Sequence, residues 1–460
     1  MEPENIRFGG GATETMVHPL VAVWMVIAIV LLLVLPRHKA ITVFLLSFFT
    51  IPVGQVVMIG SLHFTVLRIL IIAGLIRRAT YRASSSEGKY PGGFNPVDRM
   101  VVLWSVSAAV IVCLQWMNMG MLIHQLGDFL DVLGGYLVVR FLIPDREAIR
   151  RTIRTLAIVC VIQGAFMLNE QISHVNLFGF IGGPALTIRE GKIRSQGVMG
   201  CIYAGAFSGA LIPLFVWLCT QRKHRALGLV GLAGATVMVF TSNSSTSVLA
   251  LGGSLLGLAF WPLRKQMHLV RWGLVSTLVG LHLVMKAPVW ALIARIDLTG
   301  SSSGDHRYHL VDSCIRHFSD WWLLGYKYYN LWGWEAWDTC NQFVDVALHG
   351  GLVTLVAYIT IYSRSFGALG KARKETSGDR AQEWFLWSLG CTLFATVVAS
   401  FGINFMLVLH MLLFLLLAFI SVATFGARQV TVTRLQSTGP EVSPSASVAV
   451  ETHLRPHEAS

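Results

Sequence analysis

Long apolar runs, separated by short polar connections, cover most of the chain. They centre on residues 17–35, 39–53, 62–77, 100–117, 128–143, 153–170, 198–219, 225–241, 245–263, 269–286, 343–362, 384–403 and 404–426. A helix needs about 20 apolar residues to cross a bilayer, and most of these runs reach or approach that length. The pattern therefore predicts an all-α polytopic membrane protein with twelve or thirteen transmembrane helices. The runs 39–53 and 62–77 are short, so they are tilted, re-entrant or the arms of one broken hairpin.

Composition agrees with this class, since 54% of the residues are hydrophobic, 13% are charged and the mean hydropathy is +0.62. Soluble globular domains lie well outside these values. The first run follows an acidic, glycine-rich leader, which does not fit a removable signal peptide. We expect a leader, a transmembrane bundle, a large loop, a second group of transmembrane helices and a disordered tail, at 1–16, 17–287, 288–342, 343–426 and 427–460.

Basic residues predict the orientation in the membrane. With the tail in the cytoplasm, cytoplasmic connections hold 25 of the 36 Lys and Arg residues, and the opposite side holds nine. This asymmetry is the positive-inside pattern, so the large loop is expected outside the cytoplasm. The net charge of +12 is thus a signal of topology and gives no reason to expect nucleic acid as a partner.

Cations on the outer side need a local reason, and nearly all of them lie in the loops 171–197 and 286–342. The chain has no Walker loop, G-x-G-x-x-G, H-E-x-x-H or G-x-S-x-G motif, so neither a cofactor nor a tightly held metal is expected. A reaction outside the cytoplasm then requires an activated donor. A sugar chain on a polyprenyl diphosphate is one, because the diphosphate leaves readily once arginine neutralises its charge. The acceptor hydroxyl needs a base within hydrogen-bond reach.

Three arginines are candidates for contact with such a donor. Arg194 lies just before a long apolar run, where it either snorkels to the interface or clamps the diphosphate. Arg307 lies near the start of a segment with helical spacing, which Ser303 or Asp305 could cap, so we expect it in the first turn beside free N–H groups. Arg68 lies inside an apolar run, where it either contacts the donor or pairs with Asp128 or Asp131.

The seven cysteines are dispersed, with no C-x-x-C pair and no zinc spacing. Cys314 and Cys340 share the large loop. They form a disulfide in an oxidising compartment or remain two free thiols.

Three short patterns, in order, resemble the O-antigen ligase and polymerase superfamily of bacterial envelope glycosyltransferases over roughly residues 60–425. The first is R-x-x-G ahead of a mid-chain span, matched from Arg194 to Gly197. The second is a serine-rich turn between two spans, matched by TSNSSTSVLALGGSLLGL from Thr241. The third is a large loop with Arg307, then DWWLLGYKYY and CNQFVDVALHGGLVTLVAY.

This resemblance implies a GT-C-like fold in the bacterial inner membrane and metal-independent transfer of a glycan from undecaprenyl diphosphate to a glycan or lipid acceptor. By the resemblance, Arg194 and Arg307 bind the diphosphate, and a loop histidine near the acceptor would precede Asn341. This chain has Cys340 at that position, and a thiol is a poor proton acceptor unless its pKa is lowered. The substitutes open to it are His306, His309, Asp338, Asp345 and His349.

Two other functions fit a polytopic chain of this kind. A flippase for the same lipid-linked glycan should carry charges along a central path and show inverted repeats, and few charges lie at mid-span here. A peptidoglycan-type glycosyltransferase would have a similar layout. The large polar loop favours a transferase, while the sugar, the acceptor and the choice between polymerase and ligase stay open.

Overall fold

The computed structural model describes residues 15–60, 62–82, 90, 93–189, 191–295, 303–333 and 338–437, with side chains omitted at 295, 303 and 425–437. The predicted leader up to residue 14 and the tail from residue 438 lie outside these ranges. The last helix continues to Ser437, beyond the boundary expected at residue 426.

Thirteen helical segments coincide with the thirteen apolar runs. They are α1 (Pro19–Val34), α2 (Arg37–Thr50), α3 (Val66–Thr80), α4 (Pro96–Trp116), α5 (Met119–Phe129) continuing through a π-helical turn (Leu130–Gly134) into α6 (Gly135–Leu142), α7 (Arg146–Ser173), α8 (Cys201–Thr220), α9 (Arg225–Thr241), α10 (Ser245–Ala259), α11 (Met267–Val284), α14 (Gln342–Glu375), α15 (Arg380–Ser400) and α16 (Leu407–Ser437). In the described part of the chain, nine helices are long and apolar enough to cross a membrane. The all-α, multi-pass class is confirmed; the shorter α1, α2, α3 and α10 account for the higher count expected from the sequence.

The two short N-terminal runs are separate helices, α2 and α3, joined by a hairpin. Strand β1 (Val56–Ile59) pairs antiparallel with β2 (Leu62–Thr65), and α3 begins directly after β2. The run expected at 62–77 therefore starts as a strand and becomes helical at Val66.

Close backbone contacts hold the bundle together. A side chain on Gly164 of α7 would lie 2.8 Å from the carbonyl oxygen of Gly234 in α9, so the two helices touch through their backbones. Small residues commonly allow such close approach between membrane helices. Arg140 is a buried arginine inside the bundle. Its Nε lies 3.4 Å from Oδ1 of Asp98, and this ion pair compensates the charge that Arg140 carries into the bundle.

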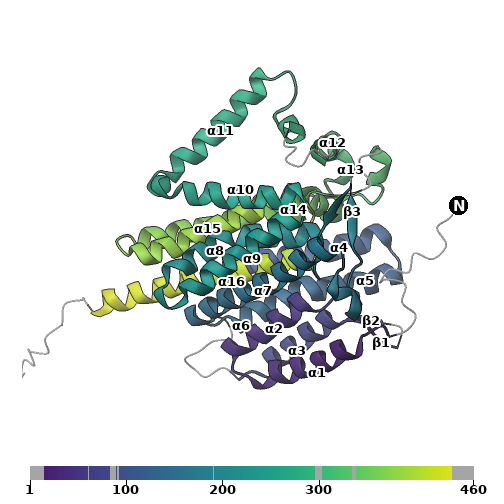
Figure 1. Ribbon diagram of the computed structural model, residues 1–460. Helices are drawn as coiled ribbons and strands as arrows, with labels where there is room; N and C mark the ends of the chain where they lie inside the picture. The colour runs from purple at the N-terminus through teal and green to yellow at the C-terminus, as the bar shows by residue number, and fades with distance from the viewer. Residues whose placement is uncertain are drawn as a thin grey trace, which may run out of the picture.

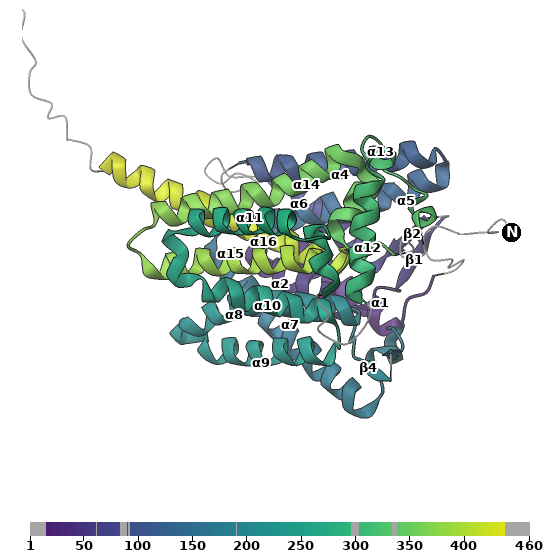
Figure 2. The ribbon, with the colours of Figure 1, turned by 90° about the horizontal axis from the view of Figure 1, so that it is seen from above.

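The connections that hold the candidate site lie together at one end of the bundle, opposite the end that α16 reaches (Figures 1 and 2). They include the hairpin of β3 (Thr187–Arg189) and β4 (Lys192–Arg194) and the large loop. The described residues of this loop include the helices α12 (Ser303–Arg316) and α13 (Phe318–Trp321) and the 3-10 turns Val289–Arg295 and Tyr329–Trp332. Other connections contain the 3-10 turns Leu177–Ile181, Arg222–His224 and Trp261–Lys265.

The large loop is hydrogen-bonded to α14 where the helix is interrupted at Gly351. Gly351 has a φ of +64°, and its neighbour Leu352 donates its N–H to the carbonyl of Trp322 at 2.8 Å. Tyr326 donates its N–H to the carbonyl of Leu348, also at 2.8 Å. The loop backbone thus satisfies groups that the helix break leaves free, as a membrane environment requires.

Helix α11 differs from the other long apolar helices, because none of its residues is buried. Figure 1 shows it extending away from the bundle, at the upper edge of the view.

Candidate functional site

The turn between α9 and α10 anchors the segment that carries Arg194. The N–H of Ser195 donates to the carbonyl of Thr241 at 3.0 Å. Nδ2 of Asn243 donates to the carbonyl of Ile193 at 2.6 Å. The backbone on both sides of Arg194 is therefore attached to one turn, the serine-rich turn at 241–247.

Arg307 reaches the same turn from the large loop. Its Nη2 donates to Oγ1 of Thr246 at 3.1 Å, and this hydroxyl donates onward to the carbonyl of Gly402 at 3.0 Å. Arg307 is buried, with 6% of its surface exposed. The serine-rich turn thus contacts the backbone on both sides of Arg194 and the side chain of Arg307, residues that are 113 positions apart in the chain.

The local position of Arg307 differs from the prediction. Helix α12 begins at Ser303, so Arg307 is its fifth residue and lies just past the first turn. Only the first four N–H groups of a helix are free of internal partners. Arg307 is therefore not itself part of the free helix end.

The carboxylate of Glu170 holds the backbone just after Arg194. Oε2 of Glu170, at the end of α7, accepts hydrogen bonds of 3.0 Å from the N–H groups of both Gln196 and Gly197. Gly197 has a φ of +53°, and a side chain there would meet Oε1 of Gln163 at 2.5 Å. The R-x-x-G pattern is thus explained locally: the arginine is followed by a turn that only glycine fits and that Glu170 holds.

Arg194 itself is partly buried at the end of β4. Its Nε atom is buried and has no hydrogen-bond partner among the described residues. A guanidinium group in this state is available for an anionic ligand, since a buried donor without an acceptor is costly.

Three of the predicted site residues, His306, Asp338 and Cys340, form one cluster. Ligand atoms of His306, Asp338 and Cys340 all lie within 4.8 Å of one another, and the three residues are partly buried. His306 precedes Arg307 in α12, whereas Asp338 and Cys340 lie just before α14. The cluster thus joins the start of α12, where Arg307 follows His306, to the segment before α14.

Asn341 has a structural position. Its Oδ1 accepts from the N–H groups of Phe343 at 2.9 Å and Val344 at 3.3 Å, so it caps α14. With 1% of its surface exposed, it has little access to a substrate. We assign it the role of a helix cap that positions the preceding Cys340.

The other substitutes for the missing histidine lie in separate pairs. His349 pairs with Asp345 at 3.4 Å on the first turns of α14, and Thr339 donates to the same Asp345 at 2.8 Å. His309 pairs with Asp305 at 3.4 Å on the exposed face of α12.

The two loop cysteines are free thiols. Cys314 is packed with Leu310 and Trp321 against α14, and burial raises the pKa of its thiol to about 12. The disulfide alternative is therefore not the one observed, although Cys340 packs against the apolar cluster that contains Cys314.

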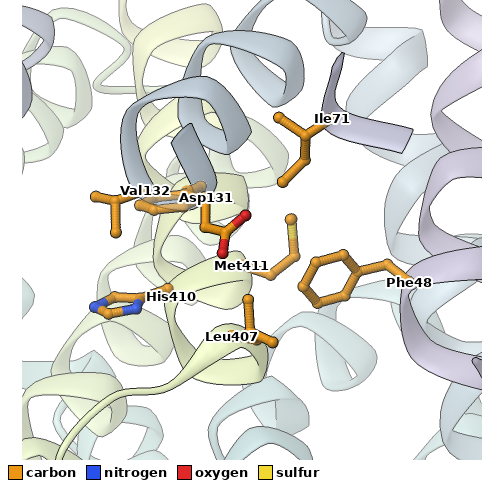
Figure 3. Close-up of a pocket in the computed structure, with 8 residues that line it drawn as sticks. Phe48, Ile71, Asp131, Val132, Leu407, His410 and Met411 are labelled. Carbon is orange, nitrogen blue, oxygen red and sulfur yellow. The ribbon is translucent and has the colours of Figure 1, made fainter. Parts of the chain in front are cut away.

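Of the two alternatives for Arg68, the structure shows the ion pair with the aspartates. Its Nη2 lies 2.6 Å from Oδ2 of Asp131 and 3.8 Å from Asp128, and its Nε donates to the other oxygen of Asp131 at 3.0 Å. Asp131 also lines a small pocket, shown in Figure 3, together with apolar residues and His410. That pocket lies beside the Arg68 pair, and none of its lining residues belongs to the serine-rich turn. Contact between Arg68 and a donor stays a prediction.

Sequence reasoning did not identify Thr246, Glu170 or Gln163 as part of the site. Thr246 lies within the serine-rich pattern, which is the only local signal for it. Glu170 and Gln163 lie on α7 among apolar residues and are buried. An acid and an amide inside an apolar run indicate that these side chains form polar contacts within the protein, and this pattern could have identified them.

No model of a known protein family matches this chain, and no curated protein matches it either.

Proposed function

We propose that this chain is a glycosyltransferase of the bacterial inner membrane. It transfers a glycan from undecaprenyl diphosphate to a glycan or lipid acceptor on the extracytoplasmic face, and so polymerises or ligates a surface polysaccharide. The observation that carries the proposal is the shared attachment of the Arg194 segment and the Arg307 side chain to the serine-rich turn.

The electrostatics of this arrangement suit a diphosphate. The Arg307 guanidinium and the backbone on both sides of Arg194 are attached to one turn, on the side of the membrane where we expect few other cations. A diphosphate carries charge on several oxygens, and arginine can contact two of them at once. Stabilising the charge that develops on the leaving diphosphate lowers the barrier to breaking the bond to the sugar.

The acceptor side of the reaction is assigned to the His306 cluster. The acceptor hydroxyl oxygen forms the new bond to the anomeric carbon, and the bond from that carbon to the diphosphate oxygen breaks. The diphosphate keeps the electron pair, and a carboxylate oxygen of Asp338 takes the hydroxyl proton; His306 is a second candidate for this role only while its imidazole binds no metal. This assignment rests on the clustering of the three side chains, on the place of His306 directly before Arg307 in α12, and on the need for a base within hydrogen-bond reach.

The test replaces Arg194 and Arg307 singly by Ala and by Lys in cells that depend on this chain. We expect loss of the surface polysaccharide in the Ala variants and partial activity at best in the Lys variants, since lysine lacks the planar fork. Arg316→Ala is the matched control, because Arg316 lies on the same helix, is 72% exposed and pairs with Asp312. Normal polysaccharide in both Ala variants would contradict the proposal.

The same cells separate the remaining functions. Shortened chains with intact attachment indicate a polymerase, and full-length polymer without attachment indicates a ligase. Lipid-linked glycan that accumulates on the outer leaflet supports a transferase, whereas accumulation on the inner leaflet indicates a flippase and contradicts the proposal.

A further inference from the structure

We propose that His306, Asp338 and Cys340 form a binding site for a zinc-class divalent cation. This inference does not rest on the proposed function, because it concerns the donor atoms alone. The three ligand atoms lie within 4.8 Å of one another. Ligand atoms of a tetrahedral zinc site are separated by somewhat less, since each lies about 2.0–2.3 Å from the metal. Small side-chain rotations would close the remaining gap.

The local backbone presents Asp338 and Cys340 together. The N–H of Asn341 donates to the carbonyl of Thr339 at 2.7 Å, so the chain bends tightly around Cys340. Thr339 is buried, and its hydroxyl is bonded to Asp345 at 2.8 Å. Asn341 then starts α14 as its cap. These bonds hold the short segment in place while the side chains of Asp338 and Cys340 meet His306.

The donor set selects the class of metal. Thiolate and imidazole favour zinc and related transition metals, whereas magnesium and calcium prefer oxygen ligands. Aspartate and a cysteine thiolate together supply two negative charges, which balance a divalent cation. The occupied site would therefore carry no net charge. Three protein ligands leave a fourth position for water or another small ligand, as in open zinc sites.

A metal at this position would link two parts of the fold. His306 comes from the start of α12, and the other two ligands immediately precede α14. The coordination bonds would fix the beginning of the loop helix, and with it the adjacent Arg307, to the membrane helix.

The test uses the purified full-length protein in detergent, titrated with Zn²⁺ and, for its visible spectrum, with Co²⁺. We expect one ion per chain and a thiolate-to-cobalt charge-transfer band. His306→Ala, Asp338→Ala and Cys340→Ser should each weaken binding by at least about tenfold. The matched controls are His309→Ala, on the same helix, and Cys314→Ser, in the apolar cluster; both should bind as the parent does.

A second measurement needs no variant in the site. Zn²⁺ should protect Cys340 of the parent protein from alkylation, as read by mass spectrometry of the labelled peptides, and a chelator should restore labelling. Binding that is unchanged in all three ligand variants, or labelling of Cys340 that Zn²⁺ does not slow, would overturn the proposal. Both measurements omit donor and acceptor, so their failure leaves the transferase proposal intact.

Discussion

Nη2 of Arg307 donates a 3.1 Å hydrogen bond to Oγ1 of Thr246, joining the loop helix α12 to the membrane helix α10. The same hydroxyl donates to the carbonyl of Gly402, at the end of α15. One threonine thus orients the buried arginine of the large loop and connects it to two membrane helices. The adjacent turn residues hold the backbone around Arg194.

Thr246→Val removes this hydroxyl and keeps the side-chain shape. A hydrogen bond to a charged group contributes about 1.5–3 kcal/mol, so we expect transfer to fall by roughly ten- to a hundredfold. Thr246→Ser should retain most of the activity because it keeps the oxygen. Thr241→Val is the control, since only its backbone contacts the Arg194 segment. Equal activity of the Val and Ser variants at position 246 would show that the hydroxyl does not orient Arg307.

Glu170→Gln tests whether the buried carboxylate positions Arg194. The neutral amide accepts more weakly from the N–H groups of Gln196 and Gly197, because bonds to a charged acceptor are the stronger ones. We expect the KM for the lipid-linked donor to rise severalfold while the melting temperature changes little. Asn169→Ala is the control, since its side chain bonds only to Ser173 of its own helix. A fall in melting temperature without any change in KM would mean that Glu170 is only structural.

Gly351→Ala should destabilise the fold. Gly351 has a φ of +64°, and a new Cβ would lie 2.6 Å from the carbonyl oxygen of Leu323. With a ψ of −171°, this backbone lies in a region that essentially only glycine adopts, so another residue there costs about 1–3 kcal/mol, and the loop must also shift. Gly367→Ala, on the same helix with no atom within 4 Å of the added carbon, should be neutral or stabilising by up to about 1 kcal/mol. Thermal unfolding in detergent measures both variants, and an equal effect would contradict the role of the break.

The Cys314 thiol should resist alkylation in the folded protein. Burial raises its pKa to about 12 from the ordinary value of 9.0, so almost no thiolate is present at neutral pH. The folded state favours the protonated form. This contribution to stability is complete below about pH 9 and is lost as the pH rises towards about 12. Mass spectrometry after maleimide labelling at pH 7 should find Cys314 unmodified until the protein is unfolded. Rapid labelling of the native protein would contradict this.

Variants of the Arg68–Asp131 pair test whether Arg68 has a structural role or contacts the donor. Arg68→Ala leaves a carboxylate that is only 15% exposed without its partner, which should cost about 3 kcal/mol. The double variant Arg68→Gln with Asp131→Asn removes both charges and should recover most of that stability. If transfer activity returns with stability, Arg68 is structural. If stability returns and activity does not, Arg68 contacts the donor.

The sequence alone determined the class of the protein and the position of its helices. Apolar runs match the helical segments because a bilayer demands long apolar helices whatever their neighbours are. It also predicted Arg194 and Arg307 as polar groups beside apolar runs and, through a resemblance, His306, Asp338 and Cys340, three residues whose ligand atoms lie within 4.8 Å of one another in the structure.

Only the tertiary structure decided how those residues are partnered. Thr246 and Glu170 look ordinary in the sequence, yet they contact Arg307 and the backbone after Arg194. Arg68 had two possible carboxylate partners, and packing chose Asp131 for the short contact. His306 meets Cys340 across 34 positions, and no spacing rule covers that separation. Helix formation depends on local composition and the solvent, whereas side-chain contacts between distant segments depend on how the helices pack.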